Sequence, residues 1–277
     1  MCSPTSGVVQ PVDRDHHRVS GPASSAPIAV AGGLPAVTTR LGHARGMDTG
    51  GEDARRAWAQ LAGLSALTDL QVVVDPDSPL GRRGWIAILA LDGTVTASVP
   101  RRDLARPVTT ALAGLTADES TSPDIVRARL PPTRSVLGPA ALFYPPPGFD
   151  PPRIPCVDEV ERIDLEDLIR SASPYEVDES GMRDVVGPLF ASRAPNGDVA
   201  AVCGYRRWPN RVAHLSVLAH PAHRAQGHAR RAATSAISQA IDERLLPQWR
   251  ARPTRSRALA RRLGLVELGA QLSFEPT

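Results

Sequence analysis

Apolar positions in the first half of the chain predict a small unit of mixed helices and strands. Asp92-Gly93 separates two short apolar runs and is typical of a two-residue hairpin. Pro107 lies inside a helical pattern and is expected to interrupt it. In order, the pattern predicts a helix at Glu52–Leu67, a strand at Leu70–Val74, a hairpin of Trp85–Leu91 and Thr94–Val99, a helix at Leu104–Leu115 and a strand at Ser135–Tyr144.

The second half predicts three consecutive antiparallel strands followed by a long helix. Asn196-Gly197 marks the tip of a hairpin. Alanine and isoleucine then recur at the spacing of one helix face after Gly227. The predicted elements are short helices at Leu165–Ala172 and Glu179–Val186, strands at Leu189–Arg193, Val199–Trp208 and Arg211–Leu218, a helix at Ala229–Glu243, a strand at Leu245–Trp249, a helix at Thr254–Leu263 with Thr254 as a possible N-cap, and a last strand or hairpin at Val266–Phe274.

Proline-rich and unpatterned stretches suggest the domain boundaries. Residues 145–152 read Pro-Pro-Pro-Gly-Phe-Asp-Pro-Pro, which predicts a linker, although a stiff loop inside one fold explains it nearly as well. Residues 1–50 show no sustained period and predict a disordered tail, with Met47 as an alternative start. We therefore expect a small α+β domain at 51–144, to which no motif assigns chemistry, and a second domain at 153–277.

Composition adds modest constraints. All 32 basic residues are arginine, which suggests a bias of the whole sequence rather than selection at each site, and the formal charge is only +3. A nucleic-acid partner is therefore not expected. Ala26–Val37 is too short to span a membrane, and no secretory signal is predicted. Cys2, Cys156 and Cys203 have no metal-ligand spacing, so we expect no metal and a reduced, cytoplasmic setting.

A strand, a turn with one glycine and a long helix follow one another from Val217 to Glu243. Such a layout presents unpaired backbone N–H groups and the positive end of a helix dipole to an anion. The spacing Arg224-x-x-Gly227-x-Ala229 resembles the (Gln/Arg)-x-x-Gly-x-(Gly/Ala) signature of the GNAT N-acetyltransferase superfamily. The resemblance covers roughly residues 160–277; an ordinary turn of another α/β domain is the alternative.

The resemblance implies an α/β (α+β) fold with a GNAT-type mixed central sheet flanked by helices. It implies acetyl-CoA as co-substrate and an amine, on a small molecule or a peptide, as acceptor. The residues that would bind acetyl-CoA along the strand and the loop are Val217, Leu218, Ala219, Arg224, Ala225, Gln226, Gly227, His228, Ala229 and Arg230. His220, His223 and His228 crowd this loop without the spacing of a zinc site.

The catalytic groups depart from the family pattern. The tyrosine that many relatives use as an acid would fall on Ala260, and the asparagine upstream of it on Pro253. Tyr205, Ser216 or Ser256 are possible substitutes for the acid. His214 is a candidate base, since its ordinary pKa near 6.5 suits proton transfer, although a structural role is the commoner one for a lone histidine.

Two charged stretches remain open. The acidic run between Asp158 and Asp184 would border the acceptor site and attract an amine, or form a solvated surface. The arginines between Arg250 and Arg262 would contact a phosphate of coenzyme A, contact nucleic acid, or simply be solvated. The expected function is acetyl transfer from acetyl-CoA to an amine by direct attack in a ternary complex. The alternatives are a catalytically silent acyl-CoA sensor or scaffold and, less favoured, a nucleic-acid-binding regulator.

Overall fold

The computed structural model describes residues 49–154, 157–159 and 162–277. The tail expected to be disordered lies outside these residues, apart from its last two positions. No helix of the described part is both long and apolar enough to cross a membrane.

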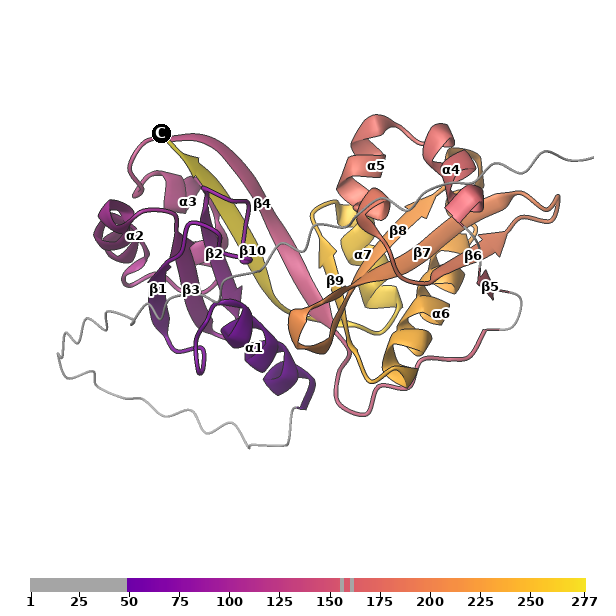
Figure 1. Ribbon diagram of the computed structural model, residues 1–277, viewed down its shortest axis with the longest axis horizontal. Helices are drawn as coiled ribbons and strands as arrows, with labels where there is room; N and C mark the ends of the chain where they lie inside the picture. Colours follow the sequence, from indigo (N-terminus) through magenta and orange to yellow (C-terminus); the bar gives the residue numbers. More distant parts are fainter. Residues whose placement is uncertain (1–48, 155–156, 160–161) are drawn as a thin grey trace, which may run out of the picture. The chain divides into compact units, whose positions relative to one another are not determined.

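Within the described residues, ten strands form one mixed sheet in the order β1-β3-β2-β10-β4-β9-β8-β7-β6-β5 (Figure 1). Most neighbours are antiparallel, whereas β1 with β3 and β8 with β9 are parallel. The mixed α/β fold expected from the sequence is therefore confirmed. The strands are β1 (Leu70–Val74), β2 (Ile86–Leu91), β3 (Thr94–Val99), β4 (Thr133–Tyr144), β5 (Asp158–Glu159), β6 (Leu189–Arg193), β7 (Val199–Trp208), β8 (Val212–Ala219), β9 (Leu246–Ala251) and β10 (Val266–Pro276).

Helices cover both faces of the sheet. In the first half, α1 (Thr49–Leu61) packs on one face, and α2 (Ala105–Leu112) with α3 (Pro123–Arg127) packs on the other. In the second half, α4 (Arg162–Ser171) and α5 (Pro174–Ser180) lie on one face of β6–β8, and α6 (His228–Asp242) and α7 (Thr254–Arg262) lie on the opposite face (Figure 1). Short 3-10 turns occur at Arg102–Leu104, Glu119–Thr121, Met182–Asp184, Pro209–Arg211 and Pro221–His223.

Successive side chains of a strand point to opposite faces of the sheet, so each strand contributes to a core on either face. In β6 and β7, Phe190 and Cys203 face the core beneath α6, while Ala191 and Val202 face the core beneath α4 and α5. The hairpin at Asp92-Gly93 is confirmed, because Leu91 pairs with Thr94 and both turn residues have positive φ, at 48° and 78°.

Three local expectations are wrong. The helix expected at Glu179–Val186 begins earlier, because Ser173 caps it with Glu176 in a capping box and Gly181 ends it. Pro107 does not interrupt a helix, since it lies in the first turn of α2, where its missing N–H costs little. Thr254 is not an N-cap; Pro253 holds that position.

The last strand also has unexpected neighbours. β10 lies between β2 and β4, and its residues pair from Gly269↔Leu91 to Phe274↔Ile86 on one side. β4 in turn pairs with β9 through Ala141↔Ala251 and Phe143↔Trp249. Val266–Phe274, expected to complete the second domain, thus pairs with strands from before the proline-rich segment. The two-domain division at 145–152 stays a prediction.

The site depends on how β8 and β9 diverge. They pair only at Val212↔Leu246, Ala213↔Pro247 and His214↔Gln248. Beyond His214, the edge of β8 that faces β9 has no strand partner among the described residues, whereas its other edge stays paired with β7 as far as Ala219. The separation leaves a row of backbone donors and acceptors facing open space.

Candidate functional site

A cavity of about 660 Å³ opens where β8 and β9 separate. β8 forms one wall, the start of α6 and its preceding loop form the second, and α7 with the end of β9 forms the third. The lining residues are Glu176, Glu179, Ser180, Leu215, Ser216, Val217, Leu218, Ala219, His223, Arg224, Ala225, Gly227, His228, Ala229, Arg230, Trp249, Arg250, Pro253, Arg255, Ser256, Leu259 and Arg262.

The N-terminus of α6 faces this cavity. Gly227 is the N-cap residue with φ of 84°, a left-handed conformation that favours glycine, and it makes no side-chain capping bond. A Cβ on Gly227 would meet the Arg231 Nη1 atom at 3.3 Å. Gly227 therefore provides no side-chain cap for the first backbone N–H groups of this 15-residue helix. These groups lie beside the large cavity, where they would donate to an anion.

Ten of the twelve residues expected in the site line this cavity. Gln226 is exposed and does not line it. His214 lines a second cavity instead. The ten are Ser216, Val217, Leu218, Ala219, Arg224, Ala225, Gly227, His228, Ala229 and Arg230.

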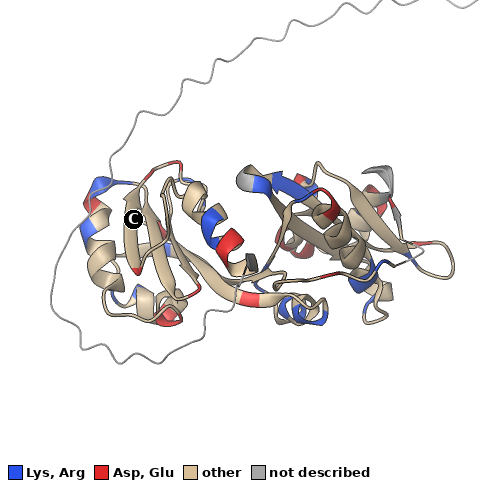
Figure 2. Cartoon of the chain, turned by 90° about the horizontal axis from the view of Figure 1, so that it is seen from below, with Lys and Arg blue, Asp and Glu red and all other residues tan. Residues whose placement is uncertain are grey.

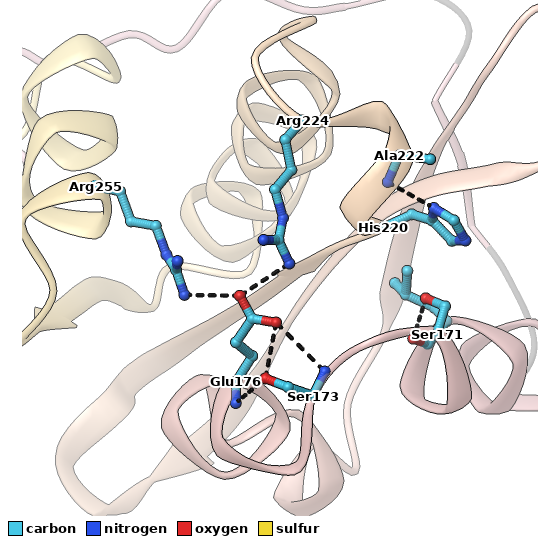
Figure 3. A network of polar contacts seen from close by, with 8 residues as sticks. Ser171, Ser173, Glu176, His220, Ala222, Arg224 and Arg255 are labelled. Atoms are coloured by element: carbon cyan, nitrogen blue, oxygen red, sulfur yellow. Dashed lines mark hydrogen bonds and ion pairs between the residues drawn. The ribbon is translucent and has the colours of Figure 1, made fainter.

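Glu176, which belongs to the acidic run between Asp158 and Asp184, lines the large cavity beside the loop before α6, a position that the sequence does not predict. Its carboxylate contacts Arg224 at 2.9 Å and Arg255 at 3.0 Å, and joins α5 to the loop before α6 and to α7 (Figure 3). Burial alone would raise the pKa of this carboxyl, but hydrogen bonds from Arg224 and Ser173 outweigh burial and lower it. The motif Ser173-Pro-Tyr-Glu176 was a readable N-terminal signal for the helix, yet nothing local indicated its partners.

A second cavity, of about 370 Å³, adjoins the first. The two share Glu179, Ser180, Leu215 and Arg250 as lining residues, so they meet where β8 and β9 part. The second cavity also contains residues from β10 and from the loop before β2. Its remaining lining residues are Pro79, Leu80, Gly81, Arg82, Leu137, Gly138, Ala140, Asp178, Gly181, Asp184, Arg206, Trp208, His214, Arg252, Gln271 and Ser273.

His214 belongs to a buried polar chain beside the second cavity. Its Nδ1 atom lies 2.9 Å from Gln248 Oε1, and the Gln248 amide donates to the Tyr144 hydroxyl at 2.8 Å. Trp58 Nε1 donates to the same hydroxyl at 2.6 Å, and the His214 ring stacks on Trp208 at 4.4 Å. Burial, followed by the charge of Arg250, lowers the pKa of His214 to about 4. At neutral pH this ring is uncharged and only weakly basic.

The hydroxyl groups near the large cavity differ in access. Ala260, at the position of the missing tyrosine, is fully buried in the core and lines neither cavity. Tyr205 is also buried in that core, and its burial raises the pKa of the phenol. Ser216 and Ser256 line the large cavity, and Ser256 accepts a hydrogen bond from Trp249 Nε1 at 3.0 Å.

The loop histidines have partners of their own. His228 Nδ1 accepts from the Arg231 guanidinium at 2.9 Å and lies 2.9 Å from Ser192 Oγ. Burial and the charge of Arg231 lower the pKa of His228, so the ring is held neutral. His220 accepts from the Ala222 backbone N–H at 3.2 Å. Among the described residues, no group of three or more His, Cys, Asp or Glu side chains has the arrangement of a metal site.

Most of the C-terminal arginines contact acidic residues. Arg252 pairs with Glu179, Arg255 with Glu176, and Arg257 and Arg261 with Glu267. Basic and acidic positions are interspersed over the chain (Figure 2), and the acidic partners of these arginines come from α5 and β10 rather than from α7 itself. A stripe of arginines neutralised in this way is a weak platform for a phosphate backbone. Arg230, Arg255 and Arg262 nevertheless line the large cavity, where a ligand phosphate would meet them.

Sequence comparison recognises this part of the chain. Residues 194–270 match the model of the GNAT acetyltransferase family. No curated protein matches the sequence.

Several solved structures resemble part of the chain. An acetyltransferase assigned to the GNAT family from Novosphingobium aromaticivorans is 19% identical, with a TM-score of 0.42, over 52% of this chain and 65% of that one. A GNAT-family acetyltransferase from Colwellia psychrerythraea is 14% identical, with a TM-score of 0.40, over 52% of this chain and 58% of its own. A ribosomal-protein-alanine N-acetyltransferase from Brucella melitensis is 17% identical, with a TM-score of 0.33, over 43% of this chain and 96% of that one.

The first two of these structures are matched over less than two thirds of their own length. Their TM-scores are low, so no feature of this chain is inferred from them. The match over residues 194–270 includes all of β7, β8, the loop before α6, α6, β9 and α7, and the start of β10. The match confirms the resemblance of the C-terminal half of the chain to the GNAT acetyltransferase family.

Proposed function

We propose that this protein transfers an acetyl group from acetyl-CoA to an amine by direct attack within a ternary complex. One observation carries the proposal: the unpaired edge of β8 and the uncapped N-terminus of α6 face the same 660 Å³ cavity. The match of residues 194–270 to the GNAT acetyltransferase model supports acyl transfer in general. The donor, the acceptor class and the mechanism are our own inference.

The lining of the large cavity supports acetyl-CoA as the donor. A pyrophosphate at the start of α6 would accept from backbone N–H groups and interact with the helix dipole. Arg224 and Arg230 line the same cavity and would supply positive charge beside the pyrophosphate. The pantetheine arm carries amide groups, which would pair with the free edge of β8 after His214.

Bound acetyl-CoA supplies a thioester, whose carbonyl carbon an amine can attack. Backbone N–H groups on the free edge of β8 are placed to donate to the carbonyl oxygen as negative charge develops there. The nitrogen must lose a proton, and His214, with a pKa of about 4, is a weak acceptor for it. We therefore expect deprotonation of the amine, through water, to limit the rate.

The leaving thiolate is stable enough to depart without a strong acid, since thiols ionise near pKa 8.5. Ser180, Ser216 and Ser256 line this cavity with hydroxyl groups; Ser180 already donates to the Val177 carbonyl, and Ser216 and Ser256 are the donors that we propose for the thiolate. The missing tyrosine thus does not by itself prevent turnover.

The test is release of coenzyme A thiol from acetyl-CoA in the presence of a broad amine panel, with calorimetric binding of acetyl-CoA measured in parallel. We expect both binding and slow turnover. The buried Ala260 and the weakly basic His214 favour a second candidate, a catalytically silent acyl-CoA sensor. Tight binding with no thiol above background would support the sensor, and absence of binding would exclude both.

A further inference from the structure

The second cavity is lined by more positive charge than its carboxylates neutralise. Four arginines reach it: Arg82, Arg206, Arg250 and Arg252. Arg252 is bound twice by Glu179, with Nε to Oε1 at 3.0 Å and Nη2 to Oε2 at 2.6 Å. The Arg82 and Arg206 guanidinium groups lie over the rings of Trp85 and Trp208, at 5.4 Å and 5.8 Å from the ring centres.

Arg250 is half-buried and has no carboxylate partner among the described residues. Its Nη1 donates to the amide oxygen of Gln271 at 3.0 Å, and none of the described carboxylates lies within ion-pair distance of it. Burial, and then the charge of Arg252, lower the pKa of Arg250, with Glu179 acting weakly in the opposite direction. A guanidinium has five N–H donors, so a half-buried one held by a single neutral oxygen has donors to spare.

We infer that the second cavity binds the acceptor and that this acceptor is a small amine carrying an oxyanion, a carboxylate or a phosphate, which Arg250 holds. The inference rests on the proposed acetyl transfer only in naming the bound molecule an acceptor. A planar guanidinium binds such a group through two parallel hydrogen bonds, and pairing would offset the cost of its partial burial.

Arg250 lies where its positive charge can bind an acceptor next to the donor. Arg250 lines both cavities, at the point where β8 and β9 part and where the thioester would lie. An oxyanion held there brings the attached amine close to the acetyl group. Asp178 and Asp184, exposed on the same cavity, offer negative charge to the ammonium form of the amine as it enters.

The experiment compares matched acceptors that differ only in charge. Glycine is compared with glycinamide, and phosphoethanolamine with ethanolamine, in thiol release and in calorimetric binding to the protein saturated with coenzyme A. We expect the charged member of at least one pair to be favoured by about tenfold or more, as charge-assisted hydrogen bonds allow. The pair that shows the preference distinguishes carboxylate from phosphate.

Arg250→Gln should reduce the charged acceptor's advantage over its neutral counterpart to near unity, and Arg250→Lys should keep part of that advantage; the ratio within each pair is compared, so a change common to both acceptors does not affect it. Arg83→Gln is the matched control, since Arg83 is exposed, pairs with Asp77 and lines neither cavity. An unchanged midpoint of thermal unfolding, measured without ligand, verifies that Arg250→Gln is folded.

The two proposals fail separately. Equal use or binding of charged and neutral acceptors, unaltered by Arg250→Gln, would overturn the oxyanion inference even if acetyl transfer is observed. Selective binding of the charged member without thiol release from any amine would retain the oxyanion site and reject the transferase.

Discussion

Glu176 and Arg224 form an ion pair, with 2.9 Å between Oε1 and Nη2, at the mouth of the large cavity. The same carboxylate oxygen contacts Arg255 at 3.0 Å (Figure 3). Arg224 therefore already holds an anion where we propose that the pyrophosphate of acetyl-CoA binds. A protein carboxylate and a ligand phosphate cannot share one guanidinium without repelling each other, so Glu176 competes with the donor.

We accordingly expect Glu176→Gln to strengthen acetyl-CoA binding by about twofold to fivefold, in line with the 0.2–1 kcal/mol typical of partly exposed ion pairs. Glutamine can still serve in the capping box of α5, so the helix should persist. Calorimetry at low and high salt measures the effect, which salt should diminish. Asp124→Asn, an exposed change of the same charge in α3, is the control. Weaker binding in Glu176→Gln would show that the carboxylate supports the donor site.

Gly227→Asp should weaken acetyl-CoA binding by an order of magnitude or more, roughly 1.4 kcal/mol or above. The variant adds a negative charge beside the anion site and a Cβ at a φ of 84°. Gly197→Asp is a matched control, because Gly197 has a φ of 90° in a hairpin turn and lines neither cavity. Both variants should lose comparable stability, and only the first should lose affinity. Equal affinity in the two variants would exclude the α6 start as the phosphate site.

The lowered pKa of His214 predicts a pH-dependent stability. The folded value of about 4 lies below the ordinary 6.5, so the unfolded chain binds the proton more tightly. Stability is therefore complete above pH 6.5 and falls as the pH drops from 6.5 towards 4, by roughly 2 kcal/mol at pH 5. Urea unfolding at pH 7 and pH 5 should show this loss in the wild-type protein and not in His214→Gln. The same loss in both would mean that other groups cause it.

The same histidine sets an expectation for catalysis. Because His214 is unprotonated above about pH 5, a rate that rises through pH 6.5 cannot report its titration. If the amine's own proton limits the reaction, the rate should continue to rise with pH and follow the acceptor's pKa. An acidic limb near pH 4 that disappears in His214→Gln would identify the histidine as the base.

Ala260→Tyr should destabilise the protein rather than restore a proton donor. Ala260 is fully buried among core residues and lines neither cavity, so a phenol there would overpack the core at a cost of about 1–3 kcal/mol. Thermal unfolding and thiol release together measure the outcome. Faster turnover at unchanged stability would show that this position reaches the thioester.

Tyr144→Phe should lower the unfolding free energy by about 1–3 kcal/mol, because Trp58 Nε1 and the Gln248 amide would both lose their acceptor. Tyr175→Phe, at a residue 68% exposed, is the control and should be neutral. A neutral Tyr144→Phe would mean that water replaces the hydroxyl.

Local signals account for what the sequence predicted well. The hairpins at Asp92-Gly93 and Asn196-Gly197, and the loop from Arg224 to Ala229, depend on residues close together along the chain. Their geometry follows from turn chemistry and from the needs of a helix start, which hold in any fold.

Pairings between distant segments escaped prediction. Arg82, Arg206 and Arg250 come from three separate elements, and no pattern in any of them indicates that they share a cavity. The pKa of His214 is lowered by burial and by the charge of Arg250. Both effects depend on the folded structure, so the ordinary pKa of histidine does not predict them. The capping box at Ser173 was visible in the sequence, and it is the signal that would have placed α5 correctly.

The position of β10 affects how this chain can fold during synthesis. β2 and β4 emerge from the ribosome long before Val266–Pro276, the segment that fills the space between them. Until then both strands carry a free edge, which is a template for wrong pairing with other chains. The strands of the first half can therefore complete their pairing only after the second half of the chain has been synthesised. Truncations that remove β10 should therefore yield a first half that aggregates. β4 would then keep only its pairing with β9.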